Sequence, residues 1–223
     1  MAKFDAIVPY SFGNFEGRVS GTDSSTTRTG FGDPLIRVSI ILIGAKPLTM
    51  SEFATNKPQK FKLGVNSRVK LPIGQYDKTK FINLGSNRWA LKLGVAGSYS
   101  IQKRVVIEAQ VNTWFFAKND EFFNGNTIEQ KPLLSGQIHG TWIFKPGVWA
   151  AVSFGRSAFG ETIINGVEKE DLKNSSRFGA AFAYRVSKHS SLKVAVTSGL
   201  STRYGADFTS ILVAYQFMWF DKT

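Results

Sequence analysis

The chain has 223 residues, no cysteine and a net charge of +12, from 28 Lys and Arg against 16 Asp and Glu. The lack of cysteine excludes disulfide bridges, thiolate metal sites and cysteine nucleophiles. The 19 phenylalanines and the 20% content of charged residues exclude a disordered chain. No uncharged stretch reaches the roughly 18 to 20 residues that a membrane helix requires. The chain is therefore soluble, or it crosses a membrane in some way other than as a helix.

The first residues, Met1–Ile7, lack the cationic start and apolar core of a secretory signal. From there on, apolar and polar side chains alternate, as between Phe61 and Leu71, which predicts strands with one apolar and one polar face. The first two predicted strands fit this pattern less well than the others. Leu48–Ala54 is the one short helix candidate. The predicted strands are residues 4–12, 33–44, 61–73, 88–101, 104–117, 132–145, 148–160, 177–187, 190–203 and 207–220.

The links between these strands mostly alternate between long and short. Short turns are expected at Ile101–Arg104, Lys145–Val148 and Val186–Ser190, with two exceptions to the alternation at 45–60 and Tyr204–Ala206. The long polar links are expected at Gly13–Gly30, Gln75–Asn87, Asn119–Lys131 and Glu161–Ser176. Short turns at one end and longer loops at the other are typical of bacterial membrane barrels.

Strand length and the placement of charges favour a membrane barrel over a soluble sandwich. The predicted strands often reach about 11 to 14 residues, whereas soluble strands centre on about 5 or 6 and roughly 9 to 11 tilted residues cross a bilayer. Arg68, Lys92 and Lys193 lie near mid-strand on the polar face. Such cations are tolerated if they line a wet lumen, but each would cost roughly 2–4 kcal/mol if it faced lipid at the midplane.

Large aromatic residues lie near the predicted strand ends. They are expected to form two girdles at the membrane interfaces. The loop side would carry Trp89 and Trp114, and the turn side Trp142, Trp149, Trp219 and Phe220.

Several motifs resemble those of the outer-membrane transporter family of the meta-pathway of phenol degradation, over most of residues 30–220. The most specific are Gly74-Gln75-Tyr76 and Asn87-Arg88-Trp89, taken together. Others are Gly30-Phe31-Gly32-Asp33-Pro34, Phe122-Phe123-Asn124-Gly125, Gln130-Lys131-Pro132-Leu133, Gly147-Val148-Trp149-Ala150, Ser176-Arg177-Phe178-Gly179, Thr202-Arg203-Tyr204-Gly205-Ala206-Asp207-Phe208 and Tyr215-Gln216-Phe217-Met218-Trp219.

The resemblance implies a passive channel in the outer membrane of a Gram-negative bacterium, for small aromatic or hydrophobic molecules. We therefore expect an all-β protein, a single antiparallel transmembrane barrel of 10 to 12 strands over residues 1–223. A signal peptide and a first hairpin are expected to be missing from this chain, since family members begin with both. The expected partners are membrane lipid, a small-molecule solute and barrel-assembly machinery, with no nucleic acid. No enzyme activity, catalytic residue, metal or cofactor is expected.

The predicted lumen face is rich in cations and has few acids, chiefly Glu108. An electropositive lumen would favour anionic or polarisable solutes. Alternatively, the inward charges pair with one another across the lumen and leave a narrow or plugged barrel. The candidate lumen-lining residues are Lys62, Arg68, Lys70, Arg88, Lys92, Arg104, Glu108, Gln110, His139, Arg177, Arg185, Lys193 and Arg203.

Two other functions stay open on the sequence alone. His189 and Ser191 have the spacing of an outer-membrane lipid hydrolase, but the first carboxylate that follows them is Asp207. The solvated turn is the simpler interpretation. A soluble ligand-binding barrel would show the same alternation, with a dry apolar interior and a polar outside.

Overall fold

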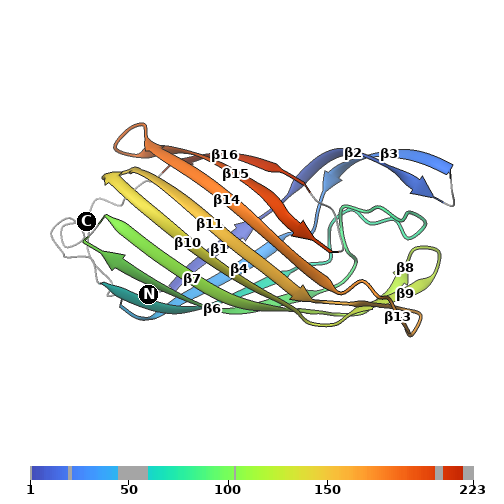
Figure 1. Cartoon of the computed structure of the whole chain (residues 1–223). Helices are drawn as coiled ribbons and strands as arrows, with labels where there is room; N and C mark the ends of the chain where they lie inside the picture. The colour runs from blue at the N-terminus through green and yellow to red at the C-terminus, as the bar shows by residue number, and fades with distance from the viewer. Residues whose placement is uncertain (1, 20–21, 45–59, 103, 204–207, 218–223) are drawn as a thin grey trace.

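The computed structural model in Figure 1 describes residues 2–19, 22–44, 60–102, 104–203 and 208–217, and the side chains of 17–24 are outside this description. The helix candidate Leu48–Ala54 and the interface residues Trp219 and Phe220 therefore lie outside the described residues. Within the described ranges, no helix is long and apolar enough to span a membrane.

Ten antiparallel strands form one large sheet, which confirms the all-β prediction. Their alternating apolar and polar residues suit a sheet whose two faces meet different surroundings. In sheet order the strands are β1 (Ala2–Ile7), β4 (Leu35–Ile43), β5 (Phe61–Lys70), β6 (Ala90–Ile101), β7 (Val105–Phe116), β10 (Leu133–Lys145), β11 (Val148–Phe159), β14 (Lys173–Arg185), β15 (Ser190–Thr202) and β16 (Ser210–Phe217).

Most large apolar side chains of this sheet face outward and are exposed. Leu93, Val111 and Val194 have exposed fractions of 46%, 58% and 40%. The concave inner face instead carries Lys62, Lys92 and their neighbours around a cavity. Arg156 is an outward cation near the loop end of β11, where Asn174 accepts its hydrogen bonds. A soluble barrel would bury its apolar face, so this arrangement contradicts the soluble alternative.

The described long links lie at one end of the sheet, the loop side, and the described tight turns lie at the other, the turn side (Figure 1). The turns before Val105, Val148 and Ser190 occur where the sequence predicts them. Between β5 and β6, residues 71–89 form a long loop without strands, also as predicted.

Three of the four links predicted to be polar loops contain strands instead. The first of these contains most of a long hairpin, β2 (Tyr10–Val19) and β3 (Thr22–Phe31), so the predicted strand 4–12 is split between β1 and β2. The others contribute β8 (Asn119–Phe122), β9 (Asn126–Gln130), β12 (Thr162–Ile164) and β13 (Val167–Glu168), which form a separate small sheet. Threonine-rich stretches such as 22–29 are predicted as loops because they are polar, although β-branched threonine favours strands.

The two edge strands of the large sheet, β1 and β16, run in opposite directions. Each neighbouring pair in the sheet is antiparallel, and ten strands are an even number, so the parity permits antiparallel closure. Among the described residues no pairing joins β1 to β16.

Candidate functional site

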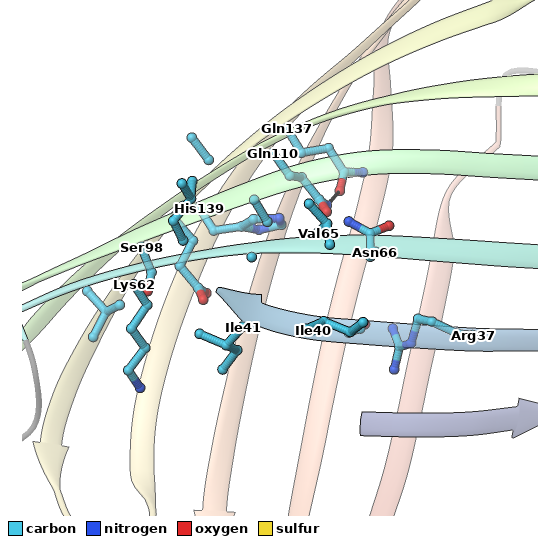
Figure 2. Close-up of a pocket in the computed structure, with 18 of the residues that line it drawn as sticks. Arg37, Ile40, Ile41, Lys62, Val65, Asn66, Ser98, Gln110, Gln137 and His139 are labelled. Atoms are coloured by element: carbon cyan, nitrogen blue, oxygen red, sulfur yellow. Dashed lines mark hydrogen bonds between the residues drawn. The ribbon is translucent and has the colours of Figure 1, made fainter. Parts of the chain in front are cut away.

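A cavity of about 860 Å³ lies on the concave face of β4, β5, β6, β7 and β10. Figure 2 shows Arg37 near one end of it and Lys62 near the other, with amide side chains between them. Six of the predicted lumen residues line this cavity: Lys62, Arg68, Lys92, Glu108, Gln110 and His139.

Three cations form a row across the loop-side end of the cavity. Arg37 of β4 is in register with Arg68 of β5, and Arg68 is in register with Lys92 of β6. Asp5 of β1 continues the row and accepts from Arg37 Nε and Nη2 at 2.9 and 2.8 Å. Like charges directly opposite on paired strands destabilise a sheet. The row therefore destabilises the sheet unless a negatively charged group lies near it.

The middle of the cavity is lined by neutral polar groups. Gln110 donates a hydrogen bond to the side chain of Gln137, its partner in register (Figure 2). Toward the turn side, Glu108 faces His139 in register, and Lys62 lies in the same row of the sheet. The inner face at this point is therefore a polar cavity lining rather than an apolar core.

Two tryptophans that the sequence assigns to the membrane interfaces face inward instead. Lys92 Nζ lies 5.7 Å from the ring centroid of Trp114, and Lys193 Nζ lies 5.7 Å from that of Trp149. Both rings are half-buried on the inner face. The interface prediction is wrong for these two residues because a position near a strand end does not by itself fix the face. Trp89 and Trp142 are exposed, at 54% and 51%.

Seven predicted lumen residues lie outside the cavity. Arg88 lies in the loop before β6, and Arg104 and Arg203 lie at strand ends. Arg177 Nη2 donates to the Phe208 carbonyl at 2.6 Å and stacks on that ring. The other three are Lys70, 3.6 Å from Asp33; Arg185, which donates to the Ser187 and Lys188 carbonyls; and Lys193 over Trp149.

The family-motif residues build the base of the loop side around Asp33, which is only 6% exposed. The Asp33 carboxylate accepts hydrogen bonds from Gly74 N at 3.0 Å and from Ser86 N and Oγ at 2.8 and 2.6 Å. A Cβ at Gly74 would lie 2.5 Å from Asp33 N, so only glycine permits this approach. Gln75 N also donates to the Phe31 carbonyl at 2.8 Å. These bonds hold both ends of the 71–89 loop to the start of β4.

A second buried centre, Asn119, joins this loop to the small sheet. Its Nδ2 donates to Tyr76 Oη at 3.0 Å and its Oδ1 accepts from Asn87 Nδ2 at 3.1 Å. Arg88 stacks over Phe116 at 4.8 Å and donates to Gln130 Oε1 at 2.6 Å. Burial lowers the pKa of Arg88. The motif residues Tyr76, Asn87 and Arg88 therefore contribute to architecture, while Trp89 projects outward.

Sequence reasoning missed Arg37, Asp33 and Asn119. Arg37 lies in a predicted strand whose alternation is imperfect, so its face was not assigned. Knowledge of the strand register, which pairs Arg37 with Arg68, would have assigned Arg37 to the inner face. Asp33 and Asn119 lie at the edges of links that look like solvated loops, and their burial depends on contacts with residues that are distant in the sequence.

The lipid-hydrolase alternative depends on the position of His189. His189 lies in the turn before β15 rather than on the strand, so the strand geometry expected for His189 and Ser191 does not form. Asp207, the nearest following carboxylate, lies outside the described residues. Among the residues that the structure describes, no group of three potential metal ligands comes together.

Comparisons with known proteins identify a family for this chain and a solved structure of similar fold. Residues 3–211 match the model of the family described as "Putative MetA-pathway of phenol degradation". The chain belongs to this family. The crystal structure of the COG4313 outer membrane channel from Pseudomonas putida F1 is similar in fold, with a TM-score of 0.76 at 19% sequence identity, over 97% of this chain and 76% of that one. No curated protein matches. The family that the motifs indicate is thereby confirmed, and the fold is similar to that of the P. putida protein.

Proposed function

We propose that this family member closes into a single antiparallel barrel in the outer membrane of a Gram-negative bacterium and conducts small aromatic or hydrophobic molecules passively. The observation that carries the proposal is the inverted arrangement of faces, with an exposed apolar outside and a polar, cationic cavity inside. A sheet edge left open in hydrocarbon would expose unpaired backbone groups at several kcal/mol each, which favours closure. Barrel-assembly machinery would insert such a chain.

Four further observations support this function. The eight inner strands of the large sheet have 9 to 13 residues, which is long enough to cross a bilayer when the strands are tilted. The family model describes a pathway that degrades phenol. The similar structure from P. putida is titled an outer membrane channel. The half-buried inward ring of Trp114, which lies beside Lys92 of the cavity, also suits aromatic solutes.

The test combines folding with conduction. The protein is refolded in detergent, and its gel migration is compared with and without heating. It is then reconstituted in a planar bilayer. The proposal predicts heat-dependent migration, stable conductance steps and a reversal potential that indicates anion preference, because the described inner face has more cations than acids. A detergent-free monodisperse protein without conductance would contradict the channel, and cation preference would contradict the electropositive lumen.

Solute passage needs its own measurement. Liposomes that contain the protein are diluted into iso-osmotic solutions of phenol-sized aromatic solutes or of a large sugar. Faster swelling with the aromatic solutes than in protein-free liposomes supports the function. Equal swelling with and without the protein would overturn it.

A further inference from the structure

Arg37, Arg68 and Lys92 form a cationic row. Its positive charge exceeds the negative charge of its described partners. Asp5 is the acid in register with this row, and it already binds Arg37 at 2.8 Å and Lys3 at 3.0 Å. Among the described residues, no carboxylate forms an ion pair with Arg68 or Lys92. The Nε atom of Arg68 is buried and has no hydrogen-bond partner there.

An unpaired buried donor and adjacent like charges both carry a cost. Neighbouring strands lie about 4.8 Å apart, so the bases of these three side chains are held close together. An anion in the cavity beside Arg68 and Lys92 would satisfy the free donor and screen the repulsion. Natural proteins often keep such local violations at functional sites.

The surroundings of the row indicate which anion fits. A guanidinium presents a planar fork that matches the two oxygens of a carboxylate. Apolar side chains of Ile41 and Val106 also line the cavity, and the Trp114 ring stands beside Lys92. A volume of about 860 Å³ lies in the range of small-molecule sites. The site therefore suits a charged head joined to an apolar or aromatic body.

We propose that Arg68 and Lys92, with Arg37 beside them, form a binding subsite for monocarboxylates that carry an aromatic or apolar group. The subsite rests on the proposed function in one respect, since solutes must reach the inner face. It lies at the loop-side end of the cavity, so a carboxylate arriving from the loop side would meet it before the neutral amides farther in.

Benzoate is the probe, and benzamide is its neutral analogue of nearly the same shape. Binding is measured by calorimetry on the detergent-purified protein, and block of conductance is measured separately in a bilayer. Loss of one charged contact predicts that the half-saturating benzoate concentration rises about tenfold in Arg68→Gln and in Lys92→Gln. Arg68→Lys keeps the charge but loses the fork, so its rise is smaller.

Lys193→Gln is the matched control. Lys193 is also an inward cation 5.7 Å from a tryptophan ring, but it lies outside the cavity. Its replacement removes the same charge, and benzoate affinity is expected to stay within about twofold of the wild type. Heat-dependent gel migration of each variant shows whether the barrel has folded.

The outcomes separate the subsite from the channel. Benzoate binding that falls in both row variants and not in Lys193→Gln supports the subsite, even if conductance is absent and the channel proposal fails. A conducting protein that does not bind benzoate overturns the subsite alone. Equal binding of benzamide, equal competition by chloride, or equal loss in Lys193→Gln would also overturn it.

Discussion

The carboxylate of Asp33 accepts two hydrogen bonds from Ser86, one from the backbone N at 2.8 Å and one from the hydroxyl at 2.6 Å. The two residues are 53 positions apart in the sequence, and they meet where the 71–89 loop returns to the sheet. Gly74 N donates a third bond at 3.0 Å. Asp33 therefore holds both ends of this loop to β4.

Replacement of Asp33 by asparagine is expected to loosen that loop. The amide has nearly the size of the carboxylate but presents an NH2 group where only acceptors fit. About 1–3 kcal/mol of loop stability should be lost. Trypsin should then cleave faster after Lys78 and Lys80, which are exposed within the loop. The measurement is limited proteolysis followed by mass spectrometry.

Asp120→Asn is the control for this change. Asp120 forms an exposed ion pair with Lys118 at 2.9 Å, and such surface pairs contribute about 0–1 kcal/mol. Cleavage after Lys78 and Lys80 should match the wild type. Equal protection of Asp33→Asn and wild type would show that the Asp33 bonds do not hold the loop.

Gly94→Ala is expected to destabilise the inner wall. A Cβ at Gly94 would lie 2.1 Å from Oδ1 and 2.8 Å from Cγ of Asn112, whose side chain is only 2% exposed. Overpacking of this kind costs about 1–3 kcal/mol. The midpoint of denaturant unfolding should fall, and the double variant Gly94→Ala, Asn112→Ala should recover part of the loss because the clashing amide is gone.

Gly136→Ala provides the comparison on the outward face. The nearest atom to its Cβ would be 3.9 Å away, so its unfolding midpoint should change little. If Gly94→Ala were as stable as Gly136→Ala, the packing of Asn112 over Gly94 would be refuted.

The 77–80 turn is expected to respond to pH through Asp77. Hydrogen bonds from the Thr79 side chain and backbone, with Lys80, lower the pKa of Asp77 from 3.8 to about 2. A depressed carboxyl pKa stabilises the folded turn fully above pH 3.8, and this stabilisation is lost as the pH falls through about 2. NMR titration of the Asp77 carboxyl carbon should give a midpoint near 2, and Thr79→Val should move it toward 3.8. A wild-type midpoint near 3.8 would contradict the turn geometry.

The sequence was sufficient for the parts of the fold that depend on local alternation. The period of two along β5, β6 and β7 fixes which side chains share a face, so the inward Lys62 and Lys92 could be predicted without coordinates. The tight turns could also be predicted, because the links between the strands that they join are short and polar. The family motifs identified the family, although not the contacts that Gly74 and Tyr76 make.

Features that depend on distant contacts could not be predicted in this way. The row Arg37–Arg68–Lys92 requires the register of three strands, and alternation alone does not give register. The burial of Asp33 and Asn119 requires loops that fold over them. The β2–β3 hairpin looked like a polar link because its strands lack an apolar face, which is the signal used elsewhere.

A charge on the outward face should block insertion, whereas the same charge one residue away on the inner face should not. Val111 is 58% exposed on the outward face, and Gln110 lines the cavity. Val111→Lys should cost roughly 2–4 kcal/mol in a bilayer if the position is near the midplane, while Gln110→Lys should cost much less. The measurement is the folded fraction in phospholipid vesicles, read from heat-dependent gel migration. Equal folding of the two variants would contradict the assigned faces.

The orientation of the two faces can be measured directly because the chain has no cysteine of its own. Single variants Val111→Cys and Gln110→Cys, spin-labelled and reconstituted in vesicles, are compared for collision with oxygen, which concentrates in lipid, and with a water-soluble nickel complex. A lipid-facing Val111 and a wet inner Gln110 predict that the label at 111 collides mainly with oxygen and the label at 110 mainly with nickel. The reverse pattern, or the same pattern at both positions, would contradict the account.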